Sequence, residues 1–276
     1  MIIEIKDDMD LEKIARSGQC FRWEAAEDGA YRIIARDRAV YLKDAGGGCF
    51  EADCSEEEFA AVWSDYLDLA VNYRALRARI DPAADPYLAA AAEAQAGIRI
   101  LRQDPWETLV SFIISQNKNI PGIMRCICLL AEAAGERRED SRGEEYYTFP
   151  DAEAILALGE DGLAACRLGY RTGYVYGAAA AQAEGGLDWP ALAQLPAEEA
   201  AAELTKLRGV GPKVASCIVL FGLHRLDSFP VDVWMKRVLK EQYPEGFPFE
   251  RYAPYNGICQ QYLFAYSRSR SSRLRS

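Results

Sequence analysis

Histidine is almost absent from this chain of 276 residues, which contains only His224. A Ser-His-Asp triad needs a histidine beside its nucleophile, and most multi-ligand zinc sites use several histidines or cysteines in close spacing. His224 falls in a predicted turn between two helices, so we interpret it as structural. The scarcity of histidine therefore argues against both kinds of catalytic site.

Long apolar runs and a basic N-terminus are also missing. A membrane-spanning helix needs about 20 predominantly apolar residues, and no segment of the sequence reaches that length. The first residues, MIIEIKDDMD, are acidic, whereas a secretory signal begins with basic residues. The eight cysteines show no pairing pattern, which is typical of reduced thiols. We expect a cytoplasmic protein that is not associated with a membrane.

Positive charge is in the minority. The chain has 32 Lys and Arg against 42 Asp and Glu, which gives a net charge of −10. This balance argues against a protein that coats nucleic acid through its overall charge. The acidic residues are concentrated in 51–68 and 132–161, whereas residues 251–276 contain five arginines and no acid. A local basic surface could still bind a short duplex, with weak nonspecific affinity and steep salt dependence.

The N-terminal third has the pattern of a sheet followed by helices. Residues 1 to about 50 alternate in short apolar runs separated by EDG and AGGG, which favours an antiparallel sheet with hairpins. From Ser55 the apolar spacing becomes helical, and Asp85-Pro86 begins a further short helix. The predicted fold class is α+β, with an N-terminal antiparallel β-sheet module with flanking helices (1–95) followed by a mostly α-helical core (96–276).

The second part reads as a series of helices. A capped helix begins at Asp104-Pro105 and is broken near residues 117–121, so two helices are expected to meet at the polar corner QNKN. Residues 136–148 are charged and are interpreted as a loop. The arginine- and serine-rich residues after Tyr266 are compatible with disorder. Further helices are predicted from Ala152, Asp161, Arg171 and Trp189, with a final helix over about 254–267.

The most informative stretch is residues 204–240, which predict helix, glycine hairpin, helix, turn and helix, with the hairpin unit at 204–222. Gly209 and Gly211 flank Val210, and glycine permits the positive φ that a sharp reversal requires. Pro212 suits the first position of the following helix. Backbone N–H groups turned outward by such a hairpin can bind a phosphate.

Lys213 and Asp232 add a possible reaction to this motif. Lys213 falls in the first helical turn, where the helix dipole favours the neutral form of an amine, and a neutral amine is a nucleophile. Asp232 reads first as the N-cap of the next helix, a role that is compatible with facing a developing cation. Taken alone, Lys213 could be a surface lysine that follows a helix hairpin, and Asp232 could be a helix cap with no other role. A phosphate-loop NTPase is excluded because the G-x-x-x-x-G-K-[ST] spacing is not met.

The run Gly-Val-Gly-Pro-Lys, with Val-Asp-Val at this spacing, resembles the helix-hairpin-helix (HhH-GPD) superfamily of DNA glycosylases. In that superfamily the lysine marks the bifunctional branch. Only Cys259 follows Asp232, so the four-cysteine iron–sulfur loop of some relatives is excluded. Other segments, in order along nearly the whole chain, resemble the 8-oxoguanine DNA glycosylase family in particular: 17–23, 97–105, 115–120, 168–171 and 259–264.

The resemblance implies a pocket for a flipped base. The carbonyl of Gly18 would accept the N7 hydrogen that distinguishes 8-oxoguanine from guanine, which demands a rigid pocket because the discrimination depends on one hydrogen bond. Phe264 and Cys217 would sandwich the base, and Gln260 would bind its Watson–Crick edge. Taken one at a time, these residues are also typical of a core phenylalanine, a core cysteine and an exposed glutamine.

The resemblance also implies a set of DNA contacts. Asn117 would fill the gap left by the flipped base, Tyr170 would wedge into the stack, and Arg171 would bind the opposite cytosine. Animal and fungal relatives have a second arginine shortly after the corner, where this chain has residues 121–123, Pro-Gly-Ile, so we expect weaker discrimination for cytosine. The remaining predicted contacts are Asn119 at the corner, Gly209 and Gly211 at the hairpin, and Trp234, where those relatives have a histidine.

The function implied is that of a bifunctional DNA glycosylase/AP lyase in base excision repair. Lys213 would attack C1′ of 8-oxoguanosine in duplex DNA while Asp232 stabilises the oxocarbenium-like charge, and the resulting Schiff base would permit strand cleavage by β-elimination. The resemblance implies a monomer with no metal or organic cofactor, although the hairpin could hold a monovalent cation. Two alternatives stay open: a glycosylase for other lesions such as oxidised pyrimidines, and a non-catalytic DNA-binding module.

Overall fold

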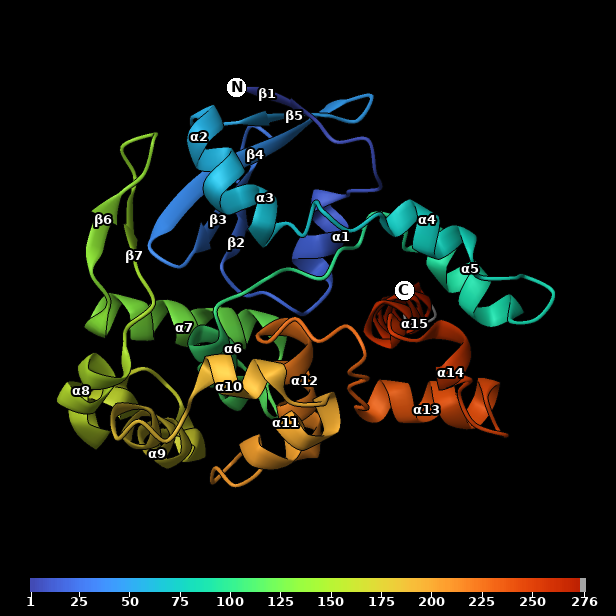
Figure 1. Cartoon of the computed structure of the whole chain (residues 1–276). Coiled ribbons are helices and arrows are strands. Elements are labelled where there is room, and N and C mark those ends of the chain that lie inside the picture. Colours follow the sequence, from blue (N-terminus) through green and yellow to red (C-terminus); the bar gives the residue numbers. More distant parts are fainter. Residues whose placement is uncertain (274–276) are drawn as a thin grey trace.

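An antiparallel sheet forms the N-terminal part of the structure, a computed structural model that describes residues 1–273 (Figure 1). Its strand order is β1-β5-β4-β3-β2. Strands β2 to β5 pair as successive hairpins, with Ile33 opposite Val40 between β3 and β4, and β1 pairs with β5 at the edge. This confirms the predicted sheet. The strands are β1 (Ile2–Glu4), β2 (Trp23–Ala25), β3 (Tyr31–Ala35), β4 (Arg38–Gly46) and β5 (Cys49–Ala52).

A small hydrophobic core lies on one face of this sheet. Ile33, Val40 and Leu42 are fully buried, because alternate residues of a strand point to the same face. They pack with Trp63 and Tyr66 in one cluster. The helices that supply this cover are α1 (Leu11–Arg16), the π-helical turn η1 (Phe59–Trp63) and α3 (Ser64–Tyr66). The short α2 (Glu56–Glu58), directly before η1, has no buried residue.

A β-hairpin, and not a loop, occupies residues 136–148, which corrects the sequence prediction. Strands β6 (Arg137–Glu139) and β7 (Glu145–Tyr147) pair with each other, and the connection between them lies on the sheet around Tyr41. The Tyr41 hydroxyl donates to Asp140 at 3.1 Å, and the Arg142 guanidinium lies 3.7 Å from the Tyr41 ring centroid. The contacts that hold this hairpin are made by polar and charged side chains to residues far away in the sequence. The apolar alternation that identifies a strand is therefore missing from residues 136–148.

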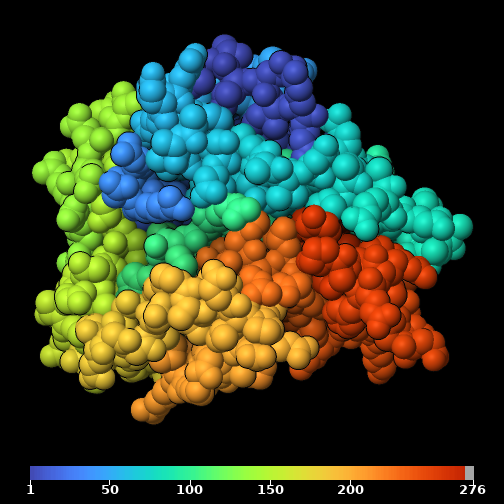
Figure 2. All heavy atoms as spheres, in the orientation of Figure 1, coloured from blue at the N-terminus to red at the C-terminus, as the bar shows by residue number. Residues whose placement is uncertain are grey.

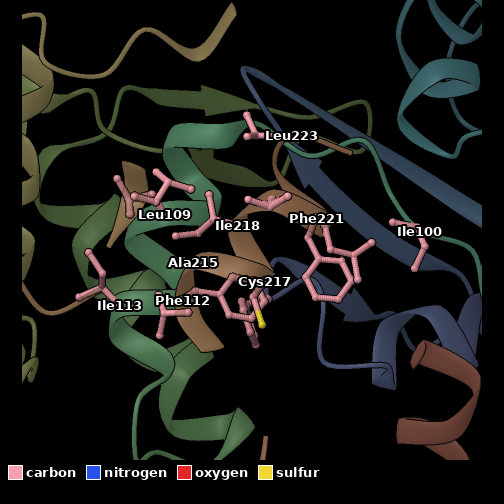
Figure 3. Close-up of a cluster of buried hydrophobic side chains, with 14 of the residues drawn as sticks. Ile100, Leu109, Phe112, Ile113, Ala215, Cys217, Ile218, Phe221 and Leu223 are labelled. Atoms are coloured by element: carbon pink, nitrogen blue, oxygen red, sulfur yellow. The ribbon is translucent and has the colours of Figure 1, made fainter. Parts of the chain in front are cut away.

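The rest of the chain is helical and has its own large core. Figure 3 shows part of it, where Phe112 and Ile113 of α6 pack with Ala215, Ile218 and Phe221 of α12. The helices are α4 (Tyr73–Ala78), α5 (Pro86–Ala94), α6 (Pro105–Ser115), α7 (Ile120–Ala134), α8 (Ala152–Ala165), the 3₁₀ turn η2 (Gly169–Arg171), α9 (Thr172–Ala183), α10 (Trp189–Gln194), α11 (Ala197–Leu204), α12 (Pro212–Phe221), α13 (Val233–Gln242), α14 (Phe249–Tyr252) and α15 (Asn256–Arg273).

The helices α4 and α5 pack with the helical core and not with the sheet. Tyr73, Leu88 and Ala91 belong to the helical cluster, and α5 lies against α15, as the teal and red surfaces of Figure 2 show. Most residues up to Leu67 thus belong to the sheet cluster and most later ones to the helical cluster, with Leu101 in the former and Phe21 in the latter as exceptions. The division into domains at residue 95 stays a prediction.

The last helix is longer than predicted. α15 continues to Arg273, so residues 267–273, which the sequence left compatible with disorder, are helical; residues 274–276 of that segment lie outside the described residues. The ring of Tyr266 packs edge-on against the ring of Tyr87 in α5, with 5.6 Å between the ring centroids. Sequence spacing does not reveal this contact. Neither α15 nor any other helix within residues 1–273 is long and apolar enough to cross a membrane.

The buried carboxyl of Glu107 should make the stability of the protein depend on pH. It lies 3.5 Å from Arg22, and burial raises its pKa to about 7 from 4.5, a rise that Arg22 opposes. The folded state therefore binds more protons, so this contribution to stability is present below pH 4.5 and is lost as the pH rises through about 7. Between about pH 5 and pH 8 the free energy of unfolding of the unmodified protein should fall. In Glu107→Gln this fall should be smaller by roughly 1–3 kcal/mol. Urea unfolding at both pH values measures this, and parallel pH profiles would contradict it.

Candidate active site

A cavity of about 1160 Å³ opens where several segments of the fold meet. Five of these lining segments are the turn after α1, the corner between α6 and α7, the hairpin before α12, the start of α13 and the middle of α15, and η2 adds Tyr170. Most of the predicted site residues line it: Gly18, Asn117, Asn119, Tyr170, Gly211, Lys213, Asp232, Trp234 and Phe264. The others lie next to a lining residue or behind the wall: Gly209, Arg171, Cys217 and Gln260.

The glycine hairpin has the predicted form, with one difference. Gly209 adopts φ +89°, and a Cβ at this position would overlap the Tyr174 ring, so glycine is required. Gly211 instead has an extended backbone, with φ −86°, and is the N-cap of α12. The carbonyl of Gly209 accepts a hydrogen bond from the Gln116 amide at 2.9 Å. This bond fixes the hairpin to the corner between α6 and α7.

Lys213 lies in the first turn of α12, directly after Pro212, as the sequence predicts. Its amine is 5.2 Å from the centroid of the Phe112 ring, and Cys217 lies one helical turn further along α12. Burial raises the pKa of the Cys217 thiol, and Lys213 opposes that rise. Cys217 itself lies within the hydrophobic cluster of Figure 3. No carboxylate within residues 1–273 forms an ion pair with Lys213, so its amine is not held by an acid.

Asp232 is the N-cap of α13, which confirms the first interpretation of this residue. One carboxylate oxygen, Oδ1, accepts from the backbone N–H of Trp234 at 3.0 Å and of Met235 at 2.9 Å. The second oxygen, Oδ2, has no hydrogen-bond or ion-pair partner in the described part of the chain. Capping therefore uses only half of the carboxylate, and the other half is available to a cationic group in the cavity.

Gly18 is held in a rigid turn. It has φ +81° and lies between two buried residues that are fixed from different parts of the chain. The carbonyl of Ser17 accepts from the Gln261 amide at 2.9 Å, and the Gln19 side chain accepts from the N–H of Leu101 at 2.8 Å. No hydrogen bond among residues 1–273 uses the carbonyl of Gly18. A fixed backbone acceptor thus lies at the cavity wall.

Gln260 is buried behind the cavity and has one polar atom without a partner. Its amide nitrogen donates to the carbonyl of Pro230 at 3.0 Å, whereas its Oε1 has no hydrogen-bond partner among the described residues. Such a buried acceptor costs free energy unless a donor reaches it. Phe264 follows Gln260 by four residues, so both lie on the same face of α15.

The corner between α6 and α7 is supported by Arg171. Asn117 is exposed at the tip of the corner with φ +50°. The buried guanidinium of Arg171 donates to the carbonyls of Gln116, Asn117 and Leu168. Tyr170, next to it, is 57% exposed beside the cavity. Arg171 therefore positions the corner in this structure, and its predicted contact with cytosine would require it to release these carbonyls.

Asn119 and Trp234 occupy structural positions at the cavity rim. The Asn119 side chain caps α7 by accepting from the N–H of Gly122 at 2.9 Å, so it has a local role whether or not it meets DNA. The guanidinium of Arg237 lies 5.5 Å from the Trp234 ring centroid. The DNA contacts predicted for these two residues stay predictions.

The lining of the cavity is basic although the chain is acidic. Lys118, Lys213, Lys236 and Arg268 line it, together with one acidic residue, Asp232. This local excess of positive charge is suited to a polyanion such as DNA. Sequence analysis did not single out Arg268. The available signal was its spacing of four residues from Phe264, but the final helix was predicted to end near residue 267, one position before Arg268.

Fold and site together define the class of the protein. A glycine hairpin that begins a helix with a lysine, followed by an aspartate N-cap across the same cavity, is the arrangement of the helix-hairpin-helix DNA glycosylases. Comparison with known proteins gives the narrower assignment. The family model described as the N-terminal domain of 8-oxoguanine DNA glycosylase matches residues 1–109.

Several known proteins are similar over most of the chain. The N-glycosylase/DNA lyase OGG1 of Arabidopsis thaliana is 32% identical over 229 residues, which are 79% of this chain and 62% of that protein. The structure of MBOgg1 in complex with a low-affinity DNA ligand is 38% identical, with a TM-score of 0.91 over 98% of this chain and 96% of the other. The 8-oxoguanine glycosylase/lyase of Clostridium acetobutylicum, in complex with double-stranded DNA containing cytosine opposite 8-oxoG, is 36% identical, with a TM-score of 0.88 and 98% of both chains covered.

These similarities establish the family. This chain belongs to the 8-oxoguanine DNA glycosylase family of the HhH-GPD superfamily. It spans about three fifths of the length of the Arabidopsis relative, whereas it covers nearly all of the two similar structures.

Proposed function

We propose that this protein is a bifunctional DNA glycosylase/AP lyase that excises 8-oxoguanine from double-stranded DNA and then cleaves the strand, in base excision repair. The observation that carries the proposal is the placement of Lys213 and Asp232 on one cavity. The Lys213 amine has no ion-pair partner among the described residues, and Asp232 uses only Oδ1 for the helix cap. The Arabidopsis, MBOgg1 and Clostridium proteins described above support it through their names.

The pocket supplies hydrogen-bond acceptors where 8-oxoguanine has donors. Gly18 lines the cavity, and no hydrogen bond among the described residues uses its carbonyl. Gln260, which is buried behind the cavity wall, has an Oε1 without a partner in the described part of the chain. The lesion carries N–H groups at N7 and on its Watson–Crick edge, whereas N7 of guanine is itself an acceptor. Guanine would therefore place a lone pair against the Gly18 carbonyl. This pairing favours 8-oxoguanine over guanine, and also over an oxidised pyrimidine, which has no N7.

The reaction follows from the positions of Lys213 and Asp232. The Lys213 amine attacks C1′, and the bond from C1′ to the base breaks, with the electron pair leaving on the base. Asp232 stabilises the positive charge that develops on the sugar. The lysine nitrogen then loses a proton and forms a C=N bond with C1′ as the C1′–O4′ bond breaks, and O4′ leaves with the electron pair and takes up a proton. Removal of a proton from C2′ of this Schiff base then expels the 3′ phosphate by β-elimination. Lysine supplies both nucleophile and electron sink, so this route requires neither a metal nor an organic cofactor.

The duplex would be held by the rim of the cavity. The backbone around Gly209 and Gly211 would bind a phosphate, with a monovalent cation as a possible bridge. Asn117 and Tyr170, both exposed at the mouth, would enter the space left by the flipped base. We propose further contacts from Asn119, Arg171 and Trp234, a monomeric enzyme, and a cytoplasmic location on the chromosome of a prokaryote.

A panel of duplexes tests this function. We expect excision and strand cleavage of 8-oxoguanine opposite cytosine, and little reaction with thymine glycol or undamaged guanine in the same sequence. Faster release of thymine glycol would indicate a glycosylase for oxidised pyrimidines. Tight binding of all duplexes without cleavage would indicate a non-catalytic DNA-binding module.

Discrimination for cytosine opposite the lesion should be weaker than in fungal relatives. Residues 121–123 replace the second arginine, and the guanidinium of Arg171 is bound to backbone carbonyls. A missing base-edge contact removes roughly 1–3 kcal/mol of discrimination, or about a 5- to 160-fold change in rate ratio. Single-turnover excision of 8-oxoguanine opposite each of the four bases measures it. A preference for cytosine equal to that of a fungal enzyme would contradict the prediction.

A further inference from the structure

Arg268 lies beside the residues that would hold the flipped base. It is one helical turn beyond Phe264 on α15 and lines the cavity. Its guanidinium carbon is 5.3 Å from the centroid of the Phe264 ring. One guanidinium nitrogen, Nη1, is 3.4 Å from the position that a Cβ of Gly18 would occupy. The guanidinium thus adjoins both the predicted stacking ring and the predicted N7 reader.

This guanidinium has no charged partner in the described part of the chain. No hydrogen bond or ion pair among residues 1–273 involves it, and its ring contact is with Phe264. Burial lowers the pKa of Arg268, an effect that the more distant Asp232 opposes. A half-buried, unpaired guanidinium costs free energy. The guanidinium has five N–H donors, and a ligand that brings acceptor oxygens into the cavity would satisfy them and offset this cost.

The order of residues along α15 indicates which part of the base Arg268 would meet. Gln260, Phe264 and Arg268 follow each other at intervals of four, so they lie on one face of the helix at a rise of about 6 Å per interval. If Gln260 binds the Watson–Crick edge and Phe264 stacks on the ring, the opposite end of the purine lies toward Arg268. That end carries C8, whose oxygen is the oxidation itself.

We propose that Arg268 is a second lesion-reading residue, whose guanidinium donates a hydrogen bond to the C8 oxygen of 8-oxoguanine. This inference rests on the proposed function. Gly18 and Arg268 together present an acceptor and a donor side by side, which complements N7–H and C8=O, adjacent groups of the lesion. Guanine has a lone pair at N7 and a hydrogen on C8, so both contacts fail. Recognition then depends on two contacts and not on the Gly18 carbonyl alone.

An abasic site separates this role from phosphate binding. It keeps the phosphates and the sugar but has no base, so a phosphate-binding arginine matters for both substrates and an O8-binding arginine matters only for 8-oxoguanine. The variant is Arg268→Met, which keeps an apolar stem against Phe264. Arg270→Met is the matched control, because Arg270 is an exposed arginine on the same helix with a similar ring contact, 5.6 Å from the Tyr266 centroid.

Single-turnover rates on the two duplexes give the result. We expect Arg268→Met to slow 8-oxoguanine excision roughly 10- to 100-fold, the range for a charged hydrogen bond, and to leave cleavage of a preformed abasic site within about twofold. Arg270→Met should leave both rates within about twofold. If Arg268→Met lowers Tm, Arg268→Lys, which keeps the charge and the stem, is compared in the same way and should again lose rate on 8-oxoguanine alone.

Three results would overturn the inference: equal losses on both duplexes, no loss on either, or an equal loss of 8-oxoguanine excision in Arg270→Met. Failure of the proposed function is seen separately, because the unmodified protein would then not excise 8-oxoguanine at all.

Discussion

Replacing Lys213 by glutamine should lower the single-turnover rate of 8-oxoguanine excision by a factor on the order of 10⁴ or more. The amine is the only nucleophile that the account provides, and glutamine keeps the length of the side chain without its reactivity. Binding of the 8-oxoguanine duplex should stay within about tenfold, because the other groups that hold the base and the phosphates are unchanged. Gel-based cleavage at saturating enzyme measures the rate, and fluorescence anisotropy measures the affinity.

Lys236→Gln is the matched control for this prediction. Lys236 also lines the cavity, from the first turns of α13, but it is exposed and has no assigned role in the reaction. Its loss should weaken binding slightly and should leave the excision rate within about threefold. Excision by Lys213→Gln at a rate near that of the control would show that another group attacks the sugar.

Asp232→Asn should separate the structural role of this residue from its electrostatic role. Asparagine caps helices as well as aspartate does, so the two bonds from the Trp234 and Met235 N–H groups to Oδ1 can remain. Stability should therefore change by less than about 1 kcal/mol. Excision should fall on the order of 10²- to 10³-fold, because the negative charge that stabilises the developing cation is lost.

The control for Asp232→Asn is a capping aspartate outside the cavity. Asp151 caps α8 by accepting from the N–H of Ala154 at 2.8 Å, and Asp151→Asn should leave both Tm and excision nearly unchanged. Thermal unfolding and single-turnover excision are measured for both variants. Unchanged excision in Asp232→Asn would reduce Asp232 to a helix cap, whereas a large fall in Tm would mean that the charge is needed for the fold.

Local sequence rules predicted the elements that position the chemistry. The hairpin before α12 follows from glycine and proline conformations, and the caps at Asp104 and Asp232 follow from side chains that accept the first free N–H groups of a helix. The alternation of the first 50 residues likewise predicted the sheet. Each of these signals lies within a few residues of the element that it specifies.

The errors concern contacts between distant parts of the chain. The β6–β7 hairpin was interpreted as a loop because its partners, such as Arg32 with Asp140 at 2.6 Å, are about a hundred positions apart. The extension of α15 to Arg273 was also missed, as was the packing of Tyr266 on Tyr87 of α5. Local propensity does not report such pairs, because the stabilisation arises only after the chain has folded.

The site shows the same division. The sequence indicated Lys213, Asp232 and the residues around them, but not what else holds the groups in place. That Arg171 supports the corner through backbone carbonyls, that Gln260 keeps a buried acceptor without a partner, and that Arg268 lies against Gly18 are all facts of tertiary structure. A sequence pattern identifies which groups can react. Which of their hydrogen-bond donors and acceptors are left without a partner depends on the tertiary packing.

Borohydride trapping on a labelled duplex with 8-oxoguanine opposite cytosine tests the central claim most directly. The account predicts that the unmodified protein gives a covalent protein–DNA adduct and that Lys213→Gln gives none, because reduction fixes a Schiff base between the Lys213 nitrogen and C1′. Release of 8-oxoguanine by the unmodified protein without an adduct would contradict it, since water and not Lys213 would then be the nucleophile.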